Sequence, residues 1–223
     1  MKKERIKNNI WYLWNDYKWL LMAGLVVAVL AMHLLFAALL KKDAALCVML
    51  VDAHTPVSES DMQRDALAAL GLDPGKYSAT FSNSLMFSDT DSGNYAMASL
   101  SRFLADIGSE KLDVCAMRED DFKKYDESGT WADLAELFGE AGMSLADEAG
   151  LSVLDEEDLL VADGRVIAIY ADALPRLQKY ECYPQEDCRG VVGIVYNAPH
   201  PENAVRYLAY LGQTGDGSLF GSE

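Results

Sequence analysis

The chain begins with one long apolar stretch and then alternates between short apolar runs and amphipathic segments. Residues 19–40 are almost wholly apolar, and His33 is their only ionisable side chain. A helix rises about 1.5 Å per residue, so this stretch is long enough to cross the roughly 30 Å apolar core of a bilayer. A cleaved signal peptide has an apolar region of about 7 to 15 residues and a small-x-small cleavage site. Because neither feature is found here, the pattern favours a retained transmembrane helix over residues 19–40.

The charges on either side of this stretch predict its orientation. Five cations precede it and two follow it: Lys2, Lys3, Arg5, Lys7 and Lys18, then Lys41 and Lys42. The side with more cations stays in the cytoplasm. We therefore expect a single-pass protein of the cell membrane with residues 1–18 as a cytoplasmic leader and residues 43–223 extracellular. Aromatic residues typical of the headgroup layer precede the helix and predict contact with bilayer lipid: Trp11, Tyr12, Trp14, Tyr17 and Trp19.

After residue 42, the hydrophobic pattern predicts strands and helices in alternation. Strands are expected at 45–53, 76–82, 111–117 and 190–197. Helices are expected from Ser58 or Ser60 to Leu70, then at 94–107, 119–126, 131–138 and 201–211. Two apolar runs flank Asp163-Gly164 and predict a β-hairpin at 159–170.

This order predicts an α/β fold whose sheet is mainly parallel and covered by helices. The strand at 190–197 is expected in the same sheet, with helix 201–211 packed on it. That helix places four apolar residues on one face, namely Ala204, Tyr207, Leu208 and Leu211. We expect one domain over 43–212 and a flexible tail at 213–223.

Charge excludes one class of partner. The chain has a net charge of −16, and 33 of its 35 acidic residues but only 12 of its 19 Lys and Arg follow residue 42. A domain this acidic repels the phosphate backbone, so nucleic-acid binding is excluded.

Two of the four cysteines call for a choice between free thiols and a disulfide. Cys47 and Cys115 lie in strand-like apolar runs, where a free cysteine behaves as a small apolar residue. Cys182 and Cys188 bracket a short polar loop, and an extracytoplasmic location permits a disulfide between them. The alternative is two free thiols, and a zinc site would need further ligands that the neighbouring sequence does not offer.

No catalytic motif is present, and we expect neither an enzyme nor a cofactor. The sequence contains no Gly-x-Ser-x-Gly elbow and no P-loop. Residues 88–94 are rich in Asp and Ser like a calcium loop, but the glycine falls one place early and Leu100 stands where such loops have Glu. Capping of the next helix by Asp91 or Ser92 explains this segment better, and no metal is expected.

Three segments resemble bacterial extracellular solute-binding proteins of the periplasmic-binding-protein-like type II. The first is Leu112-Asp113-Val114 with Asp120 to Tyr125, Gly129 and Asp133-Leu134. The second is Asp163-Gly164 with Val166 to Tyr170, which lacks the family's final Gly-x-Pro. The third is Val192 to Tyr196 with the His200 to Leu211 helix. The entry to the apolar stretch, Trp14 to Trp19, also resembles uncharacterised membrane-anchored proteins of Gram-positive bacteria.

The resemblance implies a periplasmic-binding-protein-like lobe, and the chain length implies only one. Complete family members have two lobes, whereas residues 43–223 suffice for one ordinary domain. The expected function is therefore a binding or interaction module at the cell surface, with a membrane protein or transporter subunit as a partner. The alternative is the substrate-capturing component of an ABC-type transporter, and an enzyme is a more distant alternative.

Ligand sites in parallel sheets lie at the carboxyl ends of the strands. Those ends predict six candidate ligand-binding residues: Asp52, His54, Arg118, Glu119, Asp120 and Tyr170. The competing interpretation of the acidic residues among them is structural, because carboxylates in the first turn stabilise a helix.

Overall fold

The computed structural model describes residues 18–20, 22–33, 35, 42–87, 93–142, 155–183 and 189–213. The chain divides into two compact units, Met1–Lys42 and Asp43–Glu223, and each is described by itself. The predicted helix cap, Asp91 or Ser92, lies outside the described residues, as does most of the predicted tail.

Residues 18–20 and 22–33 of the first unit are helical. Among the residues that the structure describes, no helix combines the length and the apolarity needed to cross a membrane. The predicted span of 19–40 includes residues 21, 34 and 36–40, which lie outside the described part. The transmembrane helix therefore stays a prediction.

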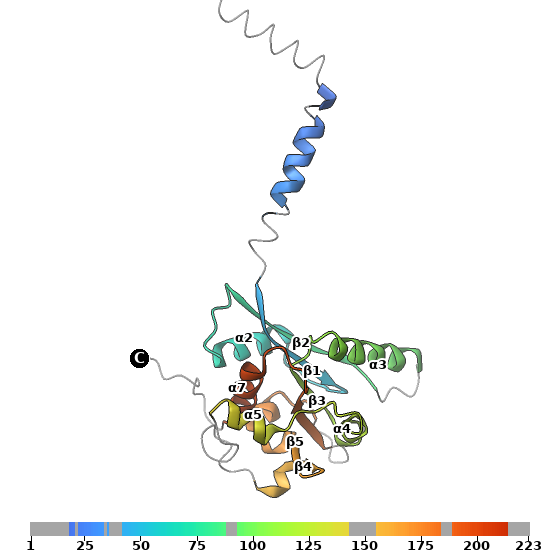
Figure 1. Ribbon diagram of the computed structural model, residues 1–223, viewed down its shortest axis with the longest axis vertical. Helices are drawn as coiled ribbons and strands as arrows, with labels where there is room; N and C mark the ends of the chain where they lie inside the picture. The colour runs from blue at the N-terminus through green and yellow to red at the C-terminus, as the bar shows by residue number, and fades with distance from the viewer. Residues whose placement is uncertain are drawn as a thin grey trace, which may run out of the picture. The chain divides into compact units, whose positions relative to one another are not determined.

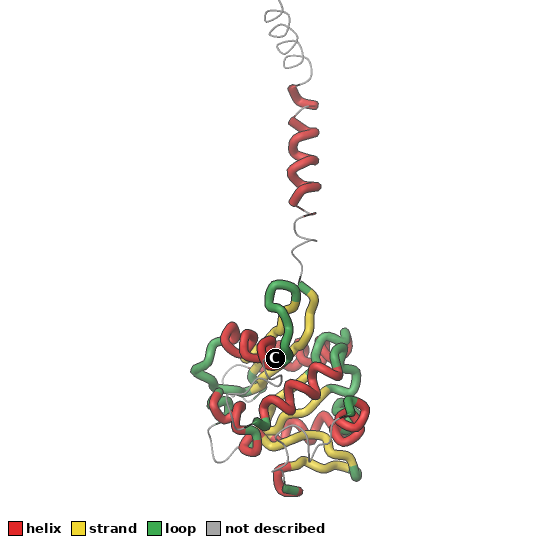
Figure 2. Tube along the Cα trace, turned by 90° about the vertical axis from the view of Figure 1, so that its left-hand side faces the viewer, coloured by secondary structure: helices red, strands yellow, loops and turns green. Residues whose placement is uncertain are grey.

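The second unit is built on one sheet of six strands in the order β2-β1-β3-β6-β5-β4. The strands are β1 (Asp43–Val51), β2 (Tyr77–Leu85), β3 (Val114–Arg118), β4 (Leu159–Ala162), β5 (Arg165–Tyr170) and β6 (Gly190–Ile194). Figure 2 shows the strands of this unit in yellow with red helices beside them. The α/β class expected from the sequence is confirmed.

The expectation of a mainly parallel sheet is wrong, because the sheet is mixed. β1 pairs parallel with both β2 and β3, as the helical connections between them require. β6 pairs antiparallel with β3, and the β4–β5 hairpin continues the sheet in antiparallel pairs. The strand at 190–194 thus joins the same sheet as predicted, but the hairpin joins it too and makes antiparallel pairs the majority.

Helices cover both faces of the sheet. The helices are α2 (Glu59–Ala69), α3 (Gly93–Gly108), α4 (Glu119–Asp126), α5 (Leu134–Glu140), α6 (Pro175–Lys179) and α7 (Pro201–Leu211). In Figure 1, α2, α5 and α7 lie on one side of the strands and α3 and α4 on the other. Each face buries its own apolar cluster, one centred on α2 and α7 and the other on the aromatic residues Phe103, Phe122 and Trp131.

Several local predictions hold because the sequence signal is strong. Ser58 caps α2 by accepting a hydrogen bond from the Asp61 amide. Asp163 and Gly164 both adopt positive φ, as a two-residue hairpin turn requires. On α7, the predicted face of Ala204, Tyr207, Leu208 and Leu211 is buried.

A buried carboxylate joins three elements at the start of β3. Asp113 is fully buried, and its Oδ2 accepts a hydrogen bond from the Cys47 amide of β1 at 2.8 Å. Its Oδ1 accepts one from the amide of His200 at 2.7 Å, and the His200 Nδ1 lies 3.2 Å from Oδ2. Because His200 is the residue before α7, this one side chain fixes β1, β3 and the start of α7 together.

Candidate functional site

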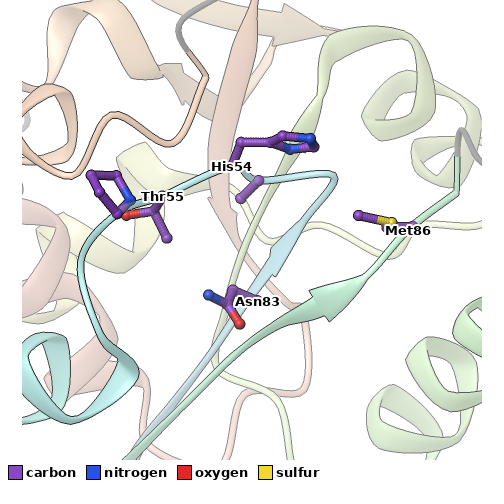
Figure 3. Close-up of a pocket in the computed structure, with 6 residues that line it drawn as sticks. His54, Thr55, Asn83 and Met86 are labelled. Carbon is purple, nitrogen blue, oxygen red and sulfur yellow. The ribbon is translucent and has the colours of Figure 1, made fainter.

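An open hollow of about 440 Å³ lies at the carboxyl ends of β1 and β2. Its lining residues are Ala53, His54, Thr55, Pro56, Asn83 and Met86. Figure 3 shows that His54 and Thr55 come from the loop after β1, whereas Asn83 and Met86 come from the end of β2 and the residue after it. The hollow therefore lies at the strand ends where the sequence places a ligand site.

The walls of the hollow are fixed by hydrogen bonds to neighbouring segments. The His54 amide donates to the Cys182 carbonyl at 3.1 Å, and the Thr55 hydroxyl donates to the Tyr180 carbonyl at 2.5 Å. On the other wall, the main-chain N–H of Asn83 donates a hydrogen bond to Oε1 of Glu59 at 3.2 Å. These contacts set the backbone and leave an imidazole, a carboxamide and a thioether as the side chains that a bound molecule would meet.

Asp52 lies beside the hollow, and its hydrogen bonds join the ends of β1 and β2. It has a φ of 53°, and its amide donates to the Leu85 carbonyl at 2.9 Å. Its Oδ1 accepts from the Phe87 amide at 2.9 Å. Asp52 thus ties the ends of β1 and β2 together, and its place in the fold is explained without a ligand.

Two other predicted residues, Glu119 and Tyr170, form a separate polar cluster. Glu119 accepts from Lys123 at 2.5 Å, and this bond, with a hydrogen bond from Tyr170, holds the pKa of the carboxyl below its usual value. The Arg189 guanidinium lies 3.7 Å from the centre of the Tyr170 ring and pairs with Asp172, with 2.9 Å from Nη2 to Oδ2. The charged and polar side chains of this cluster therefore pair with one another. They come from the start of α4, the end of β5 and the start of β6.

The last two predicted residues, Arg118 and Asp120, line neither the hollow nor this cluster. Arg118 is half-buried at the end of β3, and Asp120 is exposed in the first turn of α4. α4 begins at Glu119 with carboxylates in its first turn, where they stabilise the helix.

The sequence missed Thr55, Asn83 and Met86, which line the hollow with His54. A signal existed for Asn83, because the strand-end rule applies to β2 as well as to β1. We ended that strand at residue 82, whereas β2 continues to Leu85. Arg189 carried no signal, because no short motif links it to its ring partner Tyr170.

The described cysteines are free thiols shielded from solvent. Burial raises the pKa of both Cys47 and Cys182 from 9.0 to about 11, and nearby Asp113 and Asp106 add to the effect at Cys47. Cys115 is fully buried, and its thiol pKa is raised in the same direction. The disulfide expected between Cys182 and Cys188 stays a prediction, because Cys188 lies outside the described residues; the structure has Cys182 as a free thiol.

These thiols predict a loss of stability in alkali. Cys47 and Cys182 bind a proton more tightly in the folded chain than in the unfolded chain. Their contribution to the free energy of unfolding is therefore complete below pH 9.0 and is lost as the pH rises to about 11. We expect the free energy of unfolding of the full chain in a mild nonionic detergent to fall across this window in urea titrations. The fall should be shallower in the Cys47→Ala/Cys182→Ala double variant, and an equally steep fall would contradict this origin.

Within the described ranges, no group of three or more His, Cys, Asp or Glu side chains is arranged to hold a metal ion. Comparison of the chain with protein-family models and with curated protein sequences finds no match.

Proposed function

We propose that this chain is a membrane-anchored extracytoplasmic binding module whose α/β domain, similar to one lobe of a solute-binding protein, contacts another macromolecule at the cell surface. The apolar stretch at 19–40 and its cation bias support the anchor and its orientation. The parallel β2-β1-β3 arrangement with covering helices is compatible with the proposed lobe. The proposal assigns the chain no catalytic activity.

The openness of the hollow is the observation that carries the proposal. Sites for small ligands bury most of the ligand surface. Here His54 and Pro56 are exposed on one rim, and Met86 is 37% exposed on the other. The described residues of the second unit form one sheet domain, and none of them forms a second lobe over this rim. A surface of this shape is better suited to a protruding part of another macromolecule than to an enclosed solute.

Photo-cross-linking in living cells tests this contact. A benzophenone amino acid in place of His54 should give a discrete cross-linked species after illumination, because that position faces the hollow. The same amino acid in place of Glu136, an exposed position on α5, is the matched control. Cross-linking of equal pattern and yield from both positions, or none from position 54, would contradict the proposal.

Solute capture for a transporter is the second candidate. The observation that favours it is the pairing of an imidazole and a carboxamide, from His54 and Asn83, in one hollow of about 440 Å³. That volume falls within the range of small-molecule sites, about 300 to 1,000 Å³.

The proposed orientation predicts a labelling pattern in intact cells. In a Cys188→Ser background, Ser218→Cys should react with a membrane-impermeant maleimide added outside, because the C-terminal part is extracellular. Asn8→Cys should react only after permeabilisation. Labelling is read by the mass shift of the purified chain, and the reverse pattern would exclude this topology.

A further inference from the structure

The sheet ends in two edge strands, β2 and β4, and the structure treats them differently. β2 is covered, because Ala79 and Phe81 in its middle are buried and Glu59 and Tyr95 bond to its far end at Asn83 and Ser84. β4 is the last strand on the other side and, among the strands that the structure describes, pairs with β5 alone. Figure 1 shows β4 at the outer limit of this unit.

The outward side of β4 offers backbone groups. Ala162 and Arg165 flank the two-residue turn and face each other as a closing pair. Since residues of an antiparallel pair alternate in the direction of their bonds, the N–H and C=O of Val161 point away from β5. Val161 is 56% exposed, so this part of the edge is open to solvent.

The sequence of β4 places no charge and no proline on this edge. Natural edge strands are protected by lysine, proline, inward-pointing charges, a very short strand or a β-bulge. β4 reads Leu-Leu-Val-Ala, so its protection is limited to its length of four residues and the register shift between Leu160 and Val161. An uncharged open edge is complementary to one kind of molecule, an extended peptide that adds as a further strand.

The charges around β4 indicate the charge that a docking peptide should carry. The 3₁₀ turn before the strand, Glu156–Asp158, follows Asp155, and Asp163 stands in the hairpin turn after it. Glu156, Glu157 and Asp163 are exposed. The nearest cation along the chain, Arg165, is already paired with Asp126 at 3.2 Å. Among the residues that the structure describes, no cation forms an ion pair with Glu156, Glu157 or Asp163, so both ends of the open edge carry negative charge.

A second copy of the chain is a poor occupant for the same reason. Two β4 strands paired antiparallel would bring the acidic turn of each copy beside Asp163 of the other, and like charges in such positions are destabilising. A strand with basic residues near both ends meets opposite charges instead. We propose that β4 is a docking edge for an extended, basic peptide segment of a partner protein.

This inference rests on the proposed binding role but not on the hollow at His54. The two can therefore fail separately: the cross-linking experiment reads position 54, and the experiment below reads β4 alone.

Amide hydrogen exchange of Val161 in the ¹⁵N-labelled full chain, in detergent micelles, tests the docking edge. The probe is the peptide acetyl-Lys-Thr-Val-Thr-Val-Lys-amide, and its matched control carries Glu in place of both Lys. Without peptide, the Val161 amide should exchange rapidly. At saturation the Lys peptide should slow it by about tenfold or more, because a bonded amide exchanges only after opening. The Glu peptide should leave it unchanged.

Two variants separate docking from general effects. Val161→Pro removes the outward donor at an edge position where proline is tolerated, and it should abolish the chemical-shift changes that the Lys peptide causes at neighbouring β4 and β5 amides. Glu156→Lys/Glu157→Lys changes only exposed side chains and should weaken the Lys peptide and favour the Glu peptide. Unchanged exchange with the Lys peptide, or equal effects of both peptides on the parent chain, would overturn the proposal. So would Val161 protection that rises with protein concentration, which would show a second copy on the edge.

Discussion

Replacing Asp113 by alanine is expected to lower the free energy of unfolding by about 3 to 5 kcal/mol. The carboxylate is fully buried and accepts main-chain hydrogen bonds from Cys47 and His200. Alanine would leave both buried N–H groups without an acceptor and would also remove the partner of the His200 ring. Urea unfolding of the full chain, followed by tryptophan fluorescence in a nonionic detergent, measures the loss.

Two further variants show whether the loss comes from these hydrogen bonds. Asp113→Asn keeps one carbonyl acceptor, so it should lose about 1 to 3 kcal/mol. Asp172→Asn removes an exposed carboxylate paired with Arg189 and should lose less than about 1 kcal/mol. If Asp113→Ala were no more harmful than Asp172→Asn, Asp113 would not be the junction of β1, β3 and α7 described above.

Gly193→Ala is expected to lower the free energy of unfolding by about 3 kcal/mol, because an added methyl group has no room there. A Cβ on Gly193 would lie 2.7 Å from the Ile167 carbonyl oxygen of β5 and closer still to the Phe122 ring. The ring cannot give way easily, since it stacks on Trp131 with 3.8 Å between centroids. The same urea titration measures the effect.

Gly139→Ala is the matched control. Gly139 lies in α5, and a Cβ there would meet no atom within 4 Å. Alanine should stabilise this helix by about 0.5 to 1 kcal/mol, because glycine costs backbone entropy in a helix. A Gly193→Ala chain as stable as the Gly139→Ala chain would mean that β6 does not pack against α4 as described.

The sequence predicted the elements whose signals are local. The Ser58 cap, the Asp163-Gly164 turn and the buried face of α7 all follow from residue chemistry over a few positions. The parallel β2-β1-β3 arrangement follows as well, because parallel neighbours need a crossover connection and the sequence predicts a helix between each of these strands and the next. Strand pairing between distant segments carries no such local signal. The sequence therefore predicted the hairpin but not its pairing with β6, and the sheet proved mixed.

The candidate site was predicted at the level of the strand ends but not of individual residues. His54 lines the hollow because it lies in the loop after β1. Asp52 lies two residues before it at a positive φ, and its Oδ1 accepts a hydrogen bond from the Phe87 amide. Glu119 and Tyr170 share a hydrogen bond, and Arg189 approaches Tyr170 through tertiary packing that a single sequence does not encode in any short pattern.

The central claim is that the hollow at His54 is an open contact surface rather than a solute site. Its most direct test is thermal unfolding of the full chain in detergent, measured with free amino acids, sugars, short neutral peptides or metal ions added in turn. A solute enclosed by the hollow would stabilise the folded chain by mass action. The account predicts no saturable increase in Tm with any of these solutes, for the parent chain and for His54→Ala and Asn83→Ala alike. A saturable increase of several degrees with one solute, lost in both variants, would contradict it and establish solute capture instead.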